Sequence, residues 1–266
     1  MLGKATRVFD LEQPRTHRMP IHPAHRQAGY SYHLHRRHED DYRPDETGPR
    51  SGAAGVLTCG EHTGTHIDAL CHQSDALMLC GGVPVEAVQT PRGFTRHGVE
   101  EIPPIAAQGV LLDVAAKEGV QSLEPGRVVT AADLAECCET QGVGLGAGDV
   151  ALVRLGNARF WDDEERYLAG PGMDGSAARW MADRDVIAVG GDNMAWDAPG
   201  FEDPDLGCLL AGHLILLARR GIYIVENLAL DELAASRHYR FEFVCAPLKL
   251  VGATGSPVRP LAIVSS

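Results

Sequence analysis

A short run near position 65 combines side chains that bind divalent metal ions. His62 and His66 are four residues apart, and Asp68 follows two residues later. Two imidazole nitrogens and one carboxylate oxygen suit zinc or manganese. Three protein ligands leave coordination positions for water and substrate, as catalytic sites do and structural sites do not. We therefore predict that His62, His66 and Asp68 bind a divalent metal ion.

The neighbouring residues agree with this interpretation. Gly64 allows the backbone to turn tightly between the two histidines, and Thr63 and Thr65 can form local hydrogen bonds. His72 extends the pattern to H-x-G-T-H-x-D-x-x-x-H. Each spacing alone occurs by chance, but the combined pattern is far more restrictive. The alternative is a histidine-rich loop with a capping aspartate.

Short apolar runs alternate with helical segments along the rest of the chain. The predicted strands and the final β section are 53–59, 109–114, 149–155, 186–189, 222–225 and 240–251, and the predicted helices are 130–140, 174–184 and 212–220. This alternation predicts an α/β domain whose central sheet is at least partly parallel. Functional groups in such sheets lie at strand ends. Asp192, Asp197 and Glu226 are therefore further candidates.

Composition excludes some classes of protein. The 266 residues carry a formal net charge of -12, which argues against a nucleic-acid partner because such partners select basic surfaces. No apolar run approaches the length of a membrane span, and the N-terminal residues contain no apolar signal segment. Seven cysteines without a CxxC pair argue against a disulfide framework or a zinc ribbon. We expect a cytoplasmic protein.

Histidine is concentrated near the N-terminus. Of 12 histidines, nine lie within the first 72 residues, and six lie between His17 and His38. This part of the chain is either a solvated, loop-rich segment or a segment that folds over a polar cleft. The polar stretch 39–52, with two prolines, is predicted to be a long loop.

The run from His62 to His72 resembles the hallmark motif of the cyclase family of metal-dependent hydrolases, which includes kynurenine formamidases, isatin hydrolases and a trans-dienelactone hydrolase. Further matches extend over nearly the whole chain: Phe9–Leu11, Met19-Pro20, Pro171–Met173, Ala177–Met181, Val189–Asp192, Ile224–Leu228, Pro247–Leu250 and Ser256–Arg259. The resemblance implies one hydrolase domain over 1–266, with a loop-rich segment at 12–52. It also implies a central mixed sheet flanked by helices, of the swivelling β/β/α type, and a homodimer or homotetramer.

The resemblance also assigns roles to individual residues. It implies that His62, His66 and Asp68 bind the metal, that His72 is the acid–base histidine, and that His213 lines the pocket and orients the substrate. Ser176 stands where we expect kynurenine formamidases to carry a glutamate ligand for a second metal. The sequence therefore predicts one zinc or manganese ion per subunit, as in isatin hydrolase.

The implied reaction is hydrolysis of a small, cyclic amide carbonyl compound by water that the metal activates, with His72 carrying the proton. A lactone or ester hydrolase on the same site is the nearest alternative. A non-catalytic metal- or ligand-binding protein is an alternative of another class. A weaker alternative is an oxidoreductase whose iron ion is bound by two histidines and one carboxylate. No G-x-S-x-G elbow occurs, which disfavours a serine hydrolase. The expected partner is a small-molecule substrate, with neither nucleic acid nor membrane.

Overall fold

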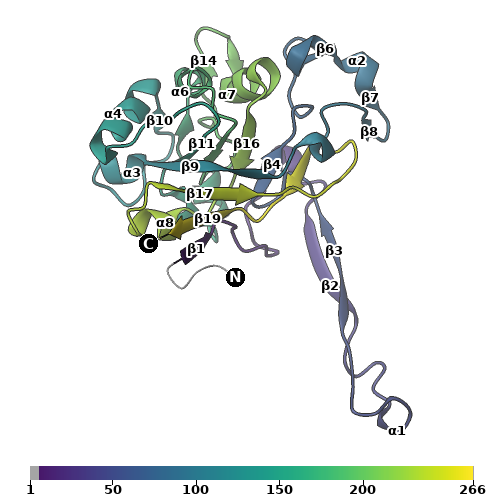
Figure 1. The fold of residues 1–266 in the computed structure, drawn as a ribbon. Coiled ribbons are helices and arrows are strands. Elements are labelled where there is room, and N and C mark those ends of the chain that lie inside the picture. The colour runs from purple at the N-terminus through teal and green to yellow at the C-terminus, as the bar shows by residue number, and fades with distance from the viewer. Residues whose placement is uncertain (1–5, 266) are drawn as a thin grey trace.

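The computed structural model describes residues 6–265, and a nine-stranded sheet forms the centre of the protein (Figure 1). The strand order is β1-β19-β17-β9-β11-β13-β16-β4-β18. In that order the strands are Thr6–Asp10, Leu261–Ser265, Arg240–Cys245, Ile105–Asp113, Val150–Arg154, Ala188–Gly191, Tyr223–Glu226, His66–Asp68 and Gly255–Pro257.

The sheet is mixed, as the fold prediction required. The four central strands β9, β11, β13 and β16 are parallel, and the strands outside them pair antiparallel. The central strands are apolar runs because both faces of the sheet are covered. Along β11, Val150 and Leu152 face one hydrophobic core, whereas Ala151 and Val153 face the other.

Helices cover the face that Ala151 and Val153 contact. They are α3 (Val114–Lys117), α4 (Ala131–Gln141), α6 (Gly175–Ala182), the short α7 (Ala211–His213) and the π-helical η5 (Leu214–Arg220). The opposite core includes α8 (Asp231–Ala235) and the side chains of β17. Among the described residues, no helix has the length and hydrophobicity needed to cross a bilayer.

Most predicted elements are present, and two differ. The helix predicted at 212–220 forms as α7 followed by a π-helical segment, which the periodicity does not distinguish from an α-helix. The β section predicted at 240–251 ends at Cys245, and β18 and β19 follow it without having been predicted. Both are short strands that complete the sheet through antiparallel pairing.

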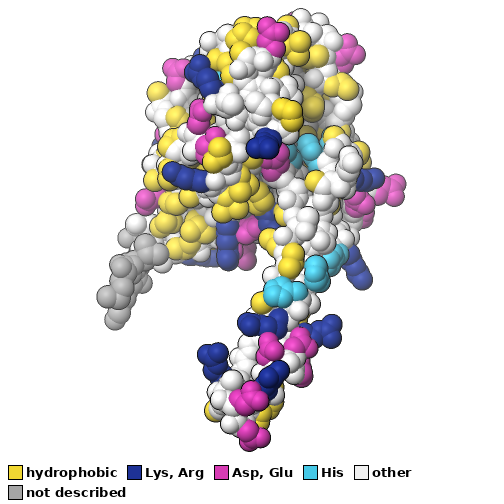
Figure 2. Space-filling view, turned by 90° about the vertical axis from the view of Figure 1, so that its right-hand side faces the viewer, with side chains coloured by type: hydrophobic (Ala, Val, Ile, Leu, Met, Phe, Trp, Pro, Cys, Tyr) yellow, Lys and Arg dark blue, Asp and Glu magenta, His cyan; other side chains and the backbone are white. Residues whose placement is uncertain are grey.

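A two-stranded arm projects from the body (Figures 1 and 2). Strand β2 (Tyr30–Arg36) pairs antiparallel with β3 (Ala54–Cys59), and α1 (Pro44–Thr47) lies in the stretch 39–52 that was predicted to be all loop. Before the arm, η1 (Pro23–His25) forms one short turn.

The remaining elements are short and connect the larger ones. They are β5 (Met78–Leu79), η2 (Cys80–Gly82), β6 (Val83–Pro84), α2 (Val85–Val88), β7 (Gln89–Thr90), β8 (Gly93–Phe94), η3 (Val99–Glu101), β10 (Val128–Val129), η4 (Asn157–Phe160), α5 (Glu164–Leu168), β12 (Gly172–Met173), β14 (Glu202–Asp203) and β15 (Cys208–Leu209).

Candidate metal centre and active site

The histidine-rich motif lies on the short buried strand β4, between β16 and β18. His66 and Asp68 are two residues apart on this strand, so their side chains point to the same face of the sheet. On β16, Glu226 stands opposite His66 in the register. The pairing therefore brings a second carboxylate to the motif from 160 positions after His66.

The turn that precedes β4 is held from several directions. Gly64 has a φ of +70°, and a Cβ atom there would collide with the guanidinium of Arg15. That guanidinium donates hydrogen bonds to the carbonyls of Thr63 and Thr65. Asn227, directly after β16, donates from Nδ2 to the Gly64 carbonyl at 2.9 Å. Glycine at this position therefore adopts the left-handed backbone without strain and leaves room for the Arg15 guanidinium.

The predicted metal ligands converge. His62 Nδ1 lies 2.8 Å from Asp68 Oδ1, and His66 Nε2 lies 3.5 Å from the same oxygen. Suitable ligand atoms of the three residues all lie within 4.8 Å of one another. Glu226 Oε2 is 3.4 Å from His66 Nε2. All four side chains are almost completely buried.

Hydrogen bonds fix which imidazole nitrogens are free. His66 donates from Nδ1 to the Gly64 carbonyl at 2.8 Å, so its Nε2 lone pair faces the carboxylates. The Thr254 hydroxyl donates to Glu61 at 2.9 Å and therefore accepts from His62 Nε2 at 2.7 Å. This leaves the Nδ1 lone pair of His62 directed at Asp68. Both tautomers are those that metal-binding histidines require.

His213, at the end of α7, belongs to the same cluster. Its Nδ1 donates to Asp197 Oδ2 at 2.8 Å. Its Nε2 lies 3.2 Å from Glu226 Oε1 and 3.6 Å from Asp68 Oδ2. Asp197 also accepts the backbone N–H of His213. A carboxylate on one ring nitrogen fixes the orientation of the other, so Asp197 is a positioning residue for His213.

His72 completes the pocket from the turn after β4. Its ring centre is 4.0 Å from that of His62 and 6.0 Å from that of His213. The enclosed volume is about 40 Å³, which holds a few water molecules. The pocket is lined by His22, His25, His62, His66, His72, Met194, Ala195, Leu210, His213 and Glu226.

Burial sets the protonation of the pocket. It lowers the pKa of His66 to about 4 and that of His72 to about 3, so both imidazoles are neutral near pH 7. Neutral imidazole is the form that binds a metal or accepts a proton. Burial, together with the charge of Asp68, raises the pKa of Glu226 to about 7. Burial opposes ionisation of Asp68 too, but the surrounding imidazoles lower the pKa of its carboxyl.

The cluster fits a divalent cation. Among the described residues, His62 Nδ1, both carboxylate oxygens of Asp68, and Glu226 Oε1 are buried without a hydrogen-bond partner. Buried polar atoms are rarely left in this way without a reason. Burial opposes a charge on His213, yet the hydrogen bond to Asp197 and the nearby carboxylate charge of Glu226 raise the pKa of its ring well above the ordinary value. The site therefore favours positive charge, which a divalent cation supplies.

The sequence reasoning about Ser176 was wrong. Its hydroxyl donates to Asp174 at 2.6 Å and accepts from the Ala131 N–H at 3.0 Å, at the start of α6. Ser176 does not line the pocket. A serine at this position therefore gives no information about a second ion. Glu226 and His213 already supply the carboxylate and the imidazole next to Asp68.

Three pocket residues were missed or undervalued. Glu226 had been named only as a further candidate at a strand end, because the sequence does not show that it pairs with His66 across the sheet. His22 and His25 belong to the N-terminal stretch that was predicted to be either a solvated, loop-rich segment or a segment that folds over a polar cleft. Both line the pocket and are only partly exposed, which agrees with the alternative of a segment over a polar cleft.

Comparison with known proteins identifies the family. Residues 9–198 match the family described as "Putative cyclase", so the chain belongs to the cyclase family. A kynurenine formamidase from Bacillus cereus is 25% identical over 256 residues, covering 96% of this chain and 97% of the relative. An isatin hydrolase from Roseibium aggregatum is 26% identical over 219 residues, covering 78% and 73%.

Solved structures share the fold. The crystal structure of a novel cyclase matches with a TM-score of 0.85 at 27% identity, covering 97% of this chain and 87% of that chain. An isatin hydrolase bound to the product analogue thioisatinate matches with a TM-score of 0.74 at 21% identity, covering 98% and 94%. The predicted family and fold class are confirmed.

Proposed function

We propose that this protein is a metal-dependent hydrolase that cleaves the C–N bond of a small, cyclic amide. The observation that carries the proposal is the convergence of His62, His66 and Asp68 on one buried point, with ligand atoms left unpaired there. Membership in the cyclase family and relatives named kynurenine formamidase and isatin hydrolase support an amide substrate.

His62, His66 and Asp68 hold the ion in this proposal. When bound, a divalent ion acidifies water and polarises a carbonyl oxygen. Two imidazoles and a carboxylate suit zinc and manganese equally. We propose one such ion per subunit. Glu226 and His213 are further candidate ligands beside Asp68, so two ions per subunit is the alternative. Metal analysis of the purified protein distinguishes one ion from two.

His72 carries the proton. Its ring lies beside His62, and burial keeps it neutral, so it can accept a proton from the attacking water and return it to the leaving nitrogen. His213 presents its Nε2 to the pocket because Asp197 holds Nδ1. We assign His213 the orientation of the substrate carbonyl.

A substrate panel tests the reaction class. The metal-loaded protein is assayed with isatin, N-formylkynurenine, a cyclic imide and a dienelactone, each with zinc and with manganese. We expect ring opening of at least one amide, and none after the metal has been removed. Turnover of the lactone alone would replace the amide proposal with the lactone alternative. A metal-loaded protein inert towards the whole panel would favour a non-catalytic binding protein.

We further propose a homodimer or homotetramer in the cytoplasm. The arm supports an oligomer, because the paired residues Tyr32 and Leu57 expose apolar side chains on the same face, with Leu34 beside them. All seven cysteines are free thiols, as expected in a reducing compartment.

A further inference from the structure

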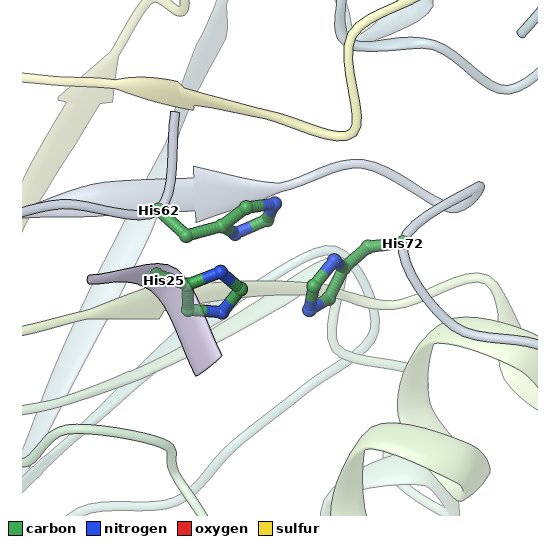
Figure 3. Close-up of side chains that lie close together, drawn as sticks. All are labelled: His25, His62 and His72. Atoms are coloured by element: carbon green, nitrogen blue, oxygen red, sulfur yellow. The ribbon is translucent and has the colours of Figure 1, made fainter. Parts of the chain in front are cut away.

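A group of three imidazoles lies at the mouth of the pocket. His25, on η1, faces His62 and His72 (Figure 3). Its ring stacks on that of His62 with centres 4.8 Å apart, and its centre is 6.1 Å from that of His72. One ring nitrogen of each histidine lies within 4.8 Å of the others. His25 does not belong to either of the other two possible ligand groups in the pocket.

The His25 ring is free to bind. Among the residues that the structure describes, neither of its nitrogens has a hydrogen-bond partner. The side chain is partly exposed and lies on a single turn of 3₁₀-helix at the edge of the pocket. The neighbouring His22 differs, because its Nδ1 accepts the Ala24 N–H at 3.3 Å.

We propose that His25, His62 and His72 form a second zinc position, which shares His62 with the site built on Asp68 and is therefore occupied as an alternative to that site. Three neutral imidazoles that leave the fourth coordination position open match the ligand set that zinc accepts in proteins. Manganese favours oxygen ligands, and this group contains none. The position therefore selects zinc over manganese, whereas the Asp68 site accepts either ion.

Occupation of this position interferes with hydrolysis. An ion bound there takes a nitrogen of His72, which can then no longer carry a proton. It also competes for His62, whose Nε2 is bonded to Thr254 and whose Nδ1 is the single free nitrogen. Excess zinc is therefore inhibitory and excess manganese is not. This consequence depends on the proposed function, but the binding of zinc does not.

Zinc binding is measured first, without reference to activity. The full-length protein is loaded with manganese, and zinc is then titrated in by calorimetry, with dialysis to count the bound ions. The wild type and His33→Ala, an exposed histidine on the arm, should take up the same amount of zinc and release the same amount of manganese, because His62 cannot bind both ions at once. His25→Ala should bind this zinc at least tenfold more weakly, and His25→Asp should recover part of the affinity. Identical titrations for the wild type and His25→Ala, or equal losses in His25→Ala and His33→Ala, would overturn the proposal.

Inhibition is measured second, with whichever amide the panel identifies. Excess zinc should slow the manganese-loaded wild type at least tenfold relative to its own rate without zinc, whereas the same zinc should slow His25→Ala less than twofold relative to that variant's own rate in manganese. Zinc inhibition of equal strength in both proteins would refute the assigned consequence. If no substrate is turned over, the proposed function fails, and the zinc titration still decides the binding site.

Discussion

Asp68 connects the groups of the site at the level of single residues. Its carboxylate lies 2.8 Å from His62, 3.5 Å from His66 and 3.6 Å from His213. The motif spacing predicted the first two contacts, because these residues are close in sequence. The contact with His213 depends on packing between distant elements, so only the family resemblance indicated it. The same reason explains why Glu226 was undervalued.

The role of His72 predicts a loss of turnover without a loss of metal. His72→Ala should lower kcat by roughly 100- to 10,000-fold, the range expected when a general acid–base group is removed. The ion at His62, His66 and Asp68 should remain, as measured by elemental analysis. His238→Ala, which removes an exposed histidine, is the matched control and should leave both values unchanged. If the kcat of His72→Ala were equal to that of the wild type, another group would have to carry the proton.

Asp197 is predicted to act through His213. Asp197→Asn keeps the size of the side chain but exchanges an acceptor oxygen for an amide, which no longer fixes the His213 tautomer. We expect a roughly 10- to 100-fold loss in kcat or in metal affinity, with a melting temperature close to that of the wild type. Asp205→Asn, at an exposed carboxylate paired with Arg179, is the control. Unchanged kinetics and metal affinity in Asp197→Asn would contradict the positioning role.

At the level of elements, the apolar runs determined what the sequence could predict. Strands β11, β13 and β16 are buried on both faces, and their continuous hydrophobic residues made them recognisable. Strand β4 has only three residues, and the motif predicted its chemistry but not its pairing. The register between β4 and β16 depends on tertiary packing, which periodicity does not encode. The element that carries the site was therefore the hardest to place.

The capping of α4 offers a prediction about stability alone. The Thr130 hydroxyl accepts the Asp133 N–H, and the Asp133 carboxylate accepts the Thr130 N–H, which is a capping box. Thr130→Ala should lower the free energy of unfolding by about 1 kcal/mol, measured by urea denaturation. Activity should not change, because α4 does not line the pocket. Thr140→Ala, an exposed change late in the same helix, serves as the control; an equal effect of the two changes would exclude a contribution from the cap.

For the whole molecule, the arm is the feature that the sequence indicated least, because the strand at 53–59 was predicted but its pairing with β2 in a projecting hairpin was not. An isolated two-stranded hairpin is marginally stable in water, and this one leaves Tyr32 49% and Leu57 58% exposed. We expect the arm to be covered in an oligomer. Light scattering should give two or four times the chain mass of 28.5 kDa, and Leu57→Glu should reduce it, whereas Val120→Glu on the body should not. A wild-type mass of a single chain would contradict this expectation.

Reconstitution with metal tests the central claim most directly. The protein is stripped with a chelator, reloaded with zinc or manganese, and assayed on the amides of the panel alongside His66→Ala and Asp68→Asn. We predict that hydrolysis disappears on stripping and returns on reloading in the wild type. The two variants should neither retain the metal nor recover activity. Hydrolysis that continues in the stripped wild type, or returns fully in Asp68→Asn, would contradict a metal-dependent hydrolase built on this motif.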